Sequence, residues 1–276
     1  GASRASTPPL QSEPMAAQSL YRRYRPQRFS ELKGQEHIVR ALKNSIVNSR
    51  EGHAYLFSGP RGTGKTTTAR ILARCLNCQA FPAPTATPCG ECDSCRRIGH
   101  DDWLDVVEVD AASSARRIDE MREWLESVRY APVASRYRVT IMDEAHQIQD
   151  SAASALLKTL EEPPPHVVFV LATTDPQKVS DTIRSRTQHL QFHLLPMDVM
   201  EDHIRWLASD AGIDLDDTAL QQLLDGARPL TPMSGLQSEP RPAAPQIEAP
   251  AHASEGWRRS QWERLVLEPG VELHLC

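Results

Sequence analysis

The amino-acid sequence predicts an α/β fold in which a parallel sheet carries a phosphate-binding loop. Between about residues 20 and 225, short apolar runs alternate with amphipathic stretches, a pattern typical of βαβ units. The segment Gly59–Thr66 also fits the pattern G-x-x-x-x-G-K-[ST] without a mismatch, directly after one of the apolar runs and before a helical one. We therefore expect a P-loop nucleotide-binding fold around a central parallel sheet.

Four apolar runs are predicted as the strands of this sheet, and each of them ends in polar residues. Ligands of open parallel sheets bind at the carboxyl ends of the strands, so these four ends are expected to face one site. A helix is expected over Thr67–Leu76, after the phosphate-binding segment. The predicted strands are Ala54–Ser58, Asp105–Asp110, Arg138–Met142 and Val167–Ala172.

Composition and charge narrow the class of protein. Of the 276 residues, 40% are hydrophobic and 24% are charged, which is typical of a globular protein. No apolar run approaches the ~18 residues of a membrane span, and no secretory signal is recognisable, so we expect a cytoplasmic protein with reduced cysteines and no membrane partner. The net charge of −5 argues against a wholly nucleic-acid-binding surface, although Tyr21–Arg28 is a basic segment.

The glycine-rich loop is expected to bind the phosphates of ATP. Gly59, Gly62 and Gly64 allow backbone N–H groups to surround the β-phosphate. Lys65 would neutralise β- and γ-phosphate oxygens, and Thr66 would offer its hydroxyl to Mg²⁺. The alternative is a chance glycine-rich turn, against which the flanking strand and helix argue. Two further residues of this segment are predicted to bind the nucleotide, Thr63 and Thr67.

Polar residues at two other strand ends are expected to complete the site. Asp143 and Glu144 follow an apolar run, and we assign Asp143 to the Mg²⁺ and Glu144 to the attacking water. An acidic helix start is the alternative, but a phosphate-binding loop needs such a partner. Thr174 follows the run Val167–Ala172, where a hydroxyl can either sense the γ-phosphate or cap a turn, and the sequence leaves both interpretations open.

Four cysteines with the spacing Cys78-x10-Cys89-x2-Cys92-x2-Cys95 are predicted to bind one zinc ion. Four thiolates close the coordination sphere, so the metal would stabilise a proline-rich loop and have no catalytic role. Cys75 competes with Cys78 in spacing, but it is more typical of an inward-facing helix residue. Disulfides are the alternative, and a reducing cytosol argues against them. Zinc removal is expected to disorder this loop and leave the nucleotide pocket largely intact.

Six ordered motifs between residues 20 and 225 point to a known family. They are Ala54–Gly62, the four-cysteine insertion, Val109–Ser113, Ala155–Pro164, Ala172–Pro176 and Ser185–Thr187. Together they resemble the gamma/tau subunit family of bacterial DNA polymerase III. The resemblance implies an AAA+ ATPase that acts as the motor of the clamp loader, with ATP, Mg²⁺ and Zn²⁺ as ligands. It also implies other clamp-loader subunits, the sliding clamp and primer-template DNA as partners.

The same resemblance assigns roles to three further residues. Arg186 corresponds to an arginine finger that reaches into the ATP site of a neighbouring subunit, although Thr187 stands where the family has cysteine. Tyr24 and Arg25 match the part of the family that wraps the adenine. From the sequence alone, a surface salt bridge is the alternative for Arg186, and a solvated basic arm is the alternative for Tyr24 and Arg25.

One departure from the family follows Leu223–Gly226. The family continues with an arginine that contacts the nucleotide from its lid domain, whereas Arg228 lies one position early here and Pro229 would stop the helix that presents it. We therefore expect an incomplete lid and no collar domain, which argues against the family's oligomer for this chain. The expected layout is a disordered leader (1–18), an AAA+ ATPase domain (19–195) with a zinc module (75–98), a partial helical lid domain (196–226), a Pro-rich linker (227–256) and an unassigned tail (257–276).

Two functions compete at this point. The leading hypothesis is an ATP-hydrolysing motor subunit that loads the sliding clamp in DNA replication. The alternative is a nucleotide- and zinc-binding interaction module that neither hydrolyses ATP nor assembles, because its lid and collar are missing. A generic Holliday-junction motor is a third hypothesis, against which the four-cysteine insertion and the run Glu161–Pro164 argue. Steady-state ATPase activity with clamp and primed DNA separates the first two.

Overall fold

A computed structural model describes most of the chain between residues 20 and 227 and a short pair of strands near its end. The described residues are 20–100, 102–114, 124, 127–148, 150–227, 264–268 and 271–274. The predicted leader, almost all of the predicted linker, and Arg228 and Pro229 lie outside these residues. The chain divides into two compact units, Gly1–Val199 and Met200–Cys276, which are described separately below.

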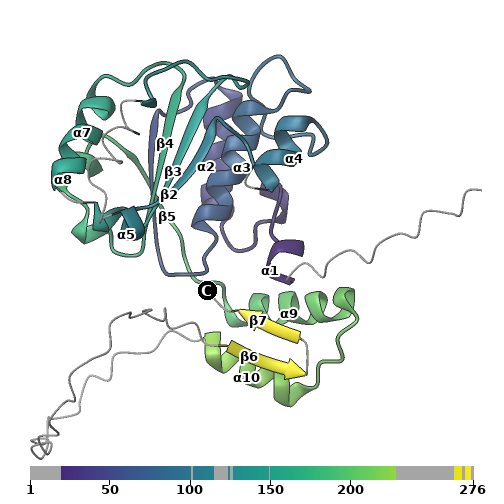
Figure 1. The fold of residues 1–276 in the computed structure, drawn as a ribbon. Helices are drawn as coiled ribbons and strands as arrows, with labels where there is room; N and C mark the ends of the chain where they lie inside the picture. Colours follow the sequence, from purple (N-terminus) through teal and green to yellow (C-terminus); the bar gives the residue numbers. More distant parts are fainter. Residues whose placement is uncertain are drawn as a thin grey trace, which may run out of the picture. The chain divides into compact units, whose positions relative to one another are not determined.

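A parallel sheet of five strands forms the centre of the first unit and confirms the predicted fold class. The strands are β1 (Ala54–Ser58), β2 (Val106–Asp110), β3 (Arg138–Asp143), β4 (Val167–Thr173) and β5 (Gln188–Gln191). Their order in the sheet is β2-β3-β4-β1-β5. This order places β1 next to β4 and β4 next to β3, so the ends of these three strands lie side by side (Figure 1).

Helices lie on both sides of this sheet, as Figure 1 shows. On one side are α2 (Glu36–Val47), α3 (Lys65–Asn77) and α4 (Asp93–Gly99); on the other are α5 (Ala111–Ser114), α7 (Asp150–Glu161) and α8 (Asp181–Arg184). Short helical turns connect several elements: α1 (Leu20–Arg23), η1 (Phe29–Glu31), η2 (Ala145–Gln147) and η3 (Pro176–Lys178).

Two hydrophobic clusters, one on each face of the sheet, hold these layers together. Successive side chains of a strand point to opposite faces, so Tyr55 and Phe57 belong to one cluster and Leu56 to the other. On the first face they pack with α2 and α3, for example with Leu72, and on the second with α7, for example with Leu156. Because the central strands are covered on both faces, they consist of nearly continuous apolar residues.

The strand β5 was not expected from the sequence. It pairs only with β1 at the edge of the sheet, and three of its four residues are exposed. An edge strand with exposed side chains needs no apolar run, because its backbone pairing with β1 holds it in place. The result is a sheet with one more strand than the four predicted.

The second unit contains most of α9 (Met197–Ala211), together with α10 (Asp217–Ala227) and the antiparallel strands β6 (Arg264–Glu268) and β7 (Val271–His274). The first three residues of α9 belong to the first unit. Arg205 on α9 pairs with Glu201 at 3.1 Å and with Asp217 at 2.9 Å. The assignment of residues 196–226 as a partial lid stays a prediction. No helix in the described part of the chain has the length and apolarity to span a membrane.

Candidate functional site

The glycine-rich loop turns sharply between β1 and α3. Gly59 has a φ of 146°, and a Cβ at this position would lie 2.5 Å from the carbonyl oxygen of Phe192, so only glycine fits. Gly64 has a φ of 90° and directly precedes the first helical residue, Lys65. The loop therefore ends at the amino terminus of a long helix, where unpaired N–H groups and the helix dipole favour an anion.

Lys65 is largely buried within this loop. Its Nζ donates hydrogen bonds to the carbonyl oxygens of Gly59 at 2.8 Å and Pro60 at 2.7 Å. Burial lowers the pKa of Lys65, and the negative charges of Asp143 and Glu144 act in the opposite direction. The ammonium group is thus held between the loop and the two acidic residues, where phosphate oxygens would meet it.

Thr66 and Asp143, which were predicted to share a magnesium ion, are in direct contact. The Thr66 hydroxyl donates to Asp143 Oδ2 at 2.9 Å, across 77 residues of sequence. Burial raises the pKa of Asp143, while the hydrogen bond from Thr66 and the charge of Lys65 oppose this rise. A hydroxyl oxygen and a carboxylate side by side are the hard oxygen ligands that Mg²⁺ prefers, so the residues fit this ion.

Glu144 lies next to Thr174, as expected if both act at one site. The Thr174 hydroxyl donates to Glu144 Oε2 at 3.3 Å. The capping role left open for Thr174 belongs instead to its neighbours: the Thr173 hydroxyl accepts the Asp175 N–H at 3.0 Å, and Asp175 caps η3 through the N–H of Gln177. The side chain of Thr174 therefore bonds to Glu144, and its role toward the γ-phosphate stays a prediction.

Two further residues contact Glu144 and were not assigned a role from the sequence. Arg61, in the middle of the phosphate-binding loop, pairs with Glu144 Oε1 at 3.2 Å. His146 Nδ1 lies 3.4 Å from Glu144 Oε2 and 3.0 Å from the Thr173 hydroxyl, so it links the ends of β3 and β4. Glu144 itself has a φ of 49°, which is unusual for a non-glycine residue and is often found at functional sites.

A pocket of about 420 Å³ opens beside the loop in the first unit. Its lining comes from the end of β1, the turn after β4 and the segment after β5. The lining residues are Ser58, Gly59, Pro60, Thr174, Pro176, Gln191, Phe192, His193 and Leu194. The pocket thus joins the phosphate-binding loop to Thr174, and it provides room for a ligand at the carboxyl edge of the sheet.

Of the two residues predicted to lie near the adenine, Arg25 reaches the site. Its Nε donates to the Thr67 hydroxyl at 3.2 Å, so Arg25 contacts the first turn of α3. The guanidinium of Arg25 also lies 5.3 Å from the ring centre of Tyr21. Tyr24 packs against the guanidinium of Arg23, whose Cζ lies 5.1 Å from the centre of the Tyr24 ring. Thr63 closes the loop by donating to the Pro60 carbonyl at 2.8 Å.

Arg186 lies apart from this cluster. It pairs with Glu161 Oε1 at 2.8 Å and donates to the Thr182 carbonyl at 2.8 Å. Within the described part of the chain, no recorded hydrogen bond joins Arg186 to Lys65 or Asp143. The salt bridge that the sequence offered as the alternative is therefore present, and the action of Arg186 on a neighbouring subunit stays a proposal.

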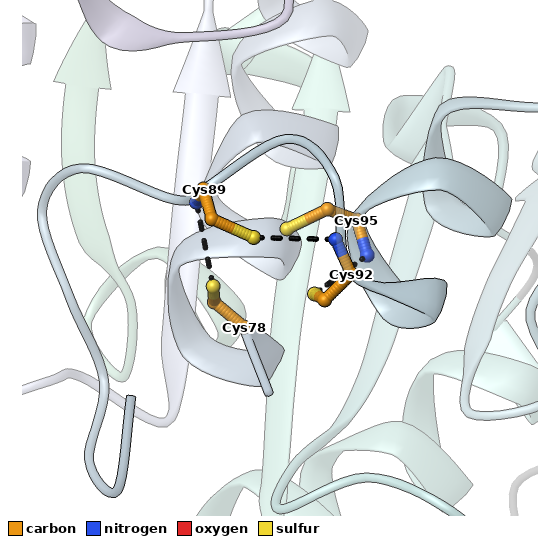
Figure 2. A group of neighbouring side chains, drawn as sticks. All are labelled: Cys78, Cys89, Cys92 and Cys95. Atoms are coloured by element: carbon orange, nitrogen blue, oxygen red, sulfur yellow. Dashed lines mark hydrogen bonds between the residues drawn. The ribbon is translucent and has the colours of Figure 1, made fainter. Parts of the chain in front are cut away.

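The four predicted zinc ligands come together in the loop between α3 and α4 (Figure 2). Their Sγ atoms all lie within 4.8 Å of one another. A tetrahedral Zn²⁺ with Zn–S bonds of about 2.3 Å requires S···S distances of about 3.8 Å, so the cluster is compatible with zinc after small adjustments. The cluster consists of Cys78, Cys89, Cys92 and Cys95, and none of them is in a disulfide.

Backbone N–H groups already point at the sulfur atoms of the cluster. The N–H of Cys92 donates to Cys89 Sγ at 3.3 Å and that of Cys95 to Cys92 Sγ at 3.5 Å (Figure 2). The hydrogen bond from the backbone N–H of Cys92 is the main cause that lowers the pKa of Cys89 to about 7. Burial raises the pKa of Cys95. Cys75 is fully buried in the core and lies outside the cluster.

Comparison with known proteins agrees with this picture. A family model described as "DNA polymerase III, delta subunit" matches residues 34–196. The chain is 50% identical over 201 residues to DNA polymerase III subunit gamma/tau of Mycobacterium tuberculosis H37Rv, covering 72% of this chain and 34% of the relative. It is 47% identical over 215 residues to subunit tau of Escherichia coli K12, covering 77% and 33%. The chain thus spans about a third of the length of each of these two relatives.

Solved structures show the fold. The Holliday junction branch migration motor RuvB of Thermotoga maritima matches with a TM-score of 0.51 and 20% identity, covering 73% of this chain and 59% of that one. At this identity the match shows a shared fold and leaves the function open. Since the family model covers more than half of the sequence, this chain belongs to the DNA polymerase III subunit family described by that model, and gamma/tau subunits are among its relatives.

Proposed function

We propose that this chain is an ATP-binding and ATP-hydrolysing motor subunit of the replicative clamp loader, which loads the sliding clamp onto primed DNA. The observation that carries the proposal is the joining of Thr66 to Asp143 and of Glu144 to Thr174 at one edge of the sheet, beside Lys65. Gamma/tau subunits among the relatives supply the biological setting.

Each residue of this cluster has a chemical task in ATP hydrolysis. Lys65 neutralises oxygens of the β- and γ-phosphates, and the backbone of the loop around Gly62 binds the remaining charge. Thr66 and Asp143 would hold Mg²⁺, which would shield the charge of the phosphates. Glu144 orients the attacking water, because its carboxylate lies beside the hydroxyl of Thr174, which would contact the γ-phosphate.

In the assembled complex, Arg186 would act on the ATP of the adjacent subunit. Its present partner Glu161 is half exposed, so the pair lies at the surface, where another subunit can displace it. The proposed partners are the other clamp-loader subunits, the sliding clamp and primer-template DNA. The cysteine cluster would hold one structural Zn²⁺.

Replacing Lys65 by alanine tests the proposal, since it removes the buried cation of the loop that is proposed to contact the β- and γ-phosphates. ATP turnover should fall to background in the presence of partner subunits, clamp and primed DNA, and ATP binding should weaken. Lys158→Ala on α7 serves as the matched control, because Lys158 is exposed and far along the chain from the loop. Normal turnover by a folded Lys65→Ala variant would refute the proposal. Binding of ATP by the wild-type chain without turnover would favour the interaction module instead.

A further inference from the structure

The helix α3 connects the two sites of this molecule. It begins with Lys65 of the phosphate-binding loop and ends at Asn77, so the zinc ligand Cys78 follows it directly. In its last turn lies Arg74, whose side chain is only 6% exposed. A buried arginine is rare without partners, because removing its charge from water is costly. The surroundings of Arg74 therefore indicate what this charge is for.

On one side Arg74 faces the cysteine cluster. Burial lowers the pKa of Arg74, and the charges of Cys95, Glu31, Cys75 and Cys92 oppose this effect, Cys95 most strongly. Four thiolates around one Zn²⁺ carry a net charge of −2, which a neighbouring cation compensates. The end of α4 packs closely here, since a Cβ at Gly99 would lie 1.9 Å from Nη2 of Arg74. Arg74 thus packs against the end of α4, the helix that contains Cys95.

On its other side Arg74 holds the segment Arg25–Arg28. Its Nη1 donates to the carbonyl oxygen of Gln27 at 3.2 Å. The next residue, Arg28, reaches the cysteine loop independently by donating to the Cys89 carbonyl at 3.0 Å. The segment is therefore attached to α3 through Gln27 and to the cysteine loop through Arg28.

The same segment reaches the nucleotide site at its other end. The side-chain amide of Gln27 donates through Nε2 to the Arg25 carbonyl at 2.8 Å, and Nε of Arg25 donates to the Thr67 hydroxyl at 3.2 Å. Thr67 follows Thr66, the proposed magnesium ligand, in the first turn of α3. Hydrogen bonds and the backbone of Arg25–Arg28 thus connect the cysteine loop to Thr67, in the first turn of the helix that follows the phosphate-binding loop.

We propose that Arg74 is a positioning residue which, together with the zinc-loaded cysteine cluster, holds Arg25 against Thr67 and thereby raises the affinity of the chain for nucleotide. Zinc occupancy would then control nucleotide binding, which revises the expectation that the pocket is independent of the metal. The inference rests on the proposed nucleotide site. The inference adds a link between the nucleotide site and the zinc site, and neither site requires this link for its own chemistry.

The test measures the affinity of the full chain for a non-hydrolysable ATP analogue by calorimetry. The zinc-loaded wild type is compared with the chelated protein and with the zinc-loaded variants Arg74→Met and Arg25→Met. Each change should weaken binding about tenfold, the loss expected from one charge-assisted hydrogen bond. Chelation, Arg74→Met and Arg25→Met all act on the contact between Arg25 and Thr67. Arg25→Met should therefore cause no further loss of affinity in chelated protein. Arg97→Met is the matched control, since Arg97 lies on α4 but pairs with Asp102 and stacks on Trp103.

Hydrogen exchange provides a readout that does not depend on nucleotide. Amides of residues 25–31 should exchange faster in chelated protein and in Arg74→Met, while that variant keeps its zinc, because Arg74 is no ligand. If Arg74→Met fails to fold, Arg28→Met replaces it, as Arg28 is exposed and its loss removes only the contact with Cys89. Unchanged affinity in both chelated protein and a folded Arg74→Met or Arg28→Met variant would overturn the inference. Failure of the zinc-loaded wild type to bind the analogue would instead refute the proposed function.

Discussion

Replacing Asp143 by asparagine should stabilise the chain in the absence of nucleotide. Burial is the largest cause that raises the pKa of Asp143, and it outweighs the hydrogen bond from Thr66 and the charge of Lys65. A raised pKa means that the folded state favours the protonated carboxyl, so ionisation at pH 7 costs stability. Asparagine has nearly the same shape, keeps an acceptor for Thr66 and removes the charge.

The expected gain is about 1 kcal/mol, typical of neutralising an unfavourable functional charge. For a chain of this size it corresponds to a rise in Tm of about 2–4 °C. A carboxyl with a raised pKa makes its full contribution to stability at pH values below its pKa in the unfolded chain. That contribution is lost as the pH rises through its pKa in the folded chain. The difference between variant and wild type should therefore shrink as the pH falls from 7 toward the ordinary value of 3.8.

Magnesium and ADP should reverse the order of stability. At about 100 times the dissociation constant, a ligand stabilises the folded state by about 2.7 kcal/mol, and Asp143→Asn should lose much of this gain because it lacks a magnesium ligand. Thermal unfolding between pH 4 and 7, with and without Mg²⁺ and ADP, measures both effects. Asp214→Asn, at an exposed position, is the control. A variant that is less stable than wild type at pH 7 without nucleotide would refute the reasoning, as would a difference that does not change with pH.

Three further predictions concern other residues. Glu144→Gln should keep ATP affinity and lower turnover by about 10²- to 10⁴-fold, since it removes the base and keeps the shape; equal turnover in a single-turnover assay would contradict this. Metal analysis should find about one zinc per chain, which is lost in Cys78→Ser and retained in Cys75→Ser. The opposite pattern would show that Cys75, and not Cys78, is the zinc ligand. Arg186→Ala should leave ATP binding by the isolated chain unchanged and lower hydrolysis by ~10³-fold only in the assembled complex, so a severe loss of affinity in the isolated chain would exclude action on a neighbour.

The strands with the clearest sequence signal are those buried on both faces. The strands β1, β3 and β4 lie inside the sheet, and their continuous apolar runs are visible in the sequence. The edge strand β2 was also predicted, over Asp105–Asp110, although most of its residues are half-exposed and its pattern is weaker. The strand β5, at the other edge, has no pattern that distinguishes it from a loop. Prediction from hydrophobic pattern thus succeeded for the three buried strands and for β2, and it failed for β5, which backbone pairing with β1 holds in the sheet.

The same distinction applies to the site. The phosphate-binding loop and the acidic pair are contiguous in sequence, so their spacing carries their chemistry. The pair Arg61–Glu144 joins residues 83 positions apart and the pair Arg25–Thr67 joins residues 42 apart, and no local pattern predicts such contacts. Cys75 illustrates how local geometry decides between neighbours. The helix ends at Asn77 and Cys78 is extended, so the two cysteines leave the backbone in different directions.

A structure of the full chain with Mg²⁺ and a non-hydrolysable ATP analogue tests the central claim most directly. The account predicts the phosphates in the loop Gly59–Thr66, with Lys65 Nζ moved from the carbonyls of Gly59 and Pro60 to phosphate oxygens. It also predicts Mg²⁺ beside Thr66 and Asp143, with Glu144 and Thr174 facing the γ-phosphate. An analogue bound elsewhere, or a Lys65 that stays on its two carbonyls while the analogue is bound, would contradict it.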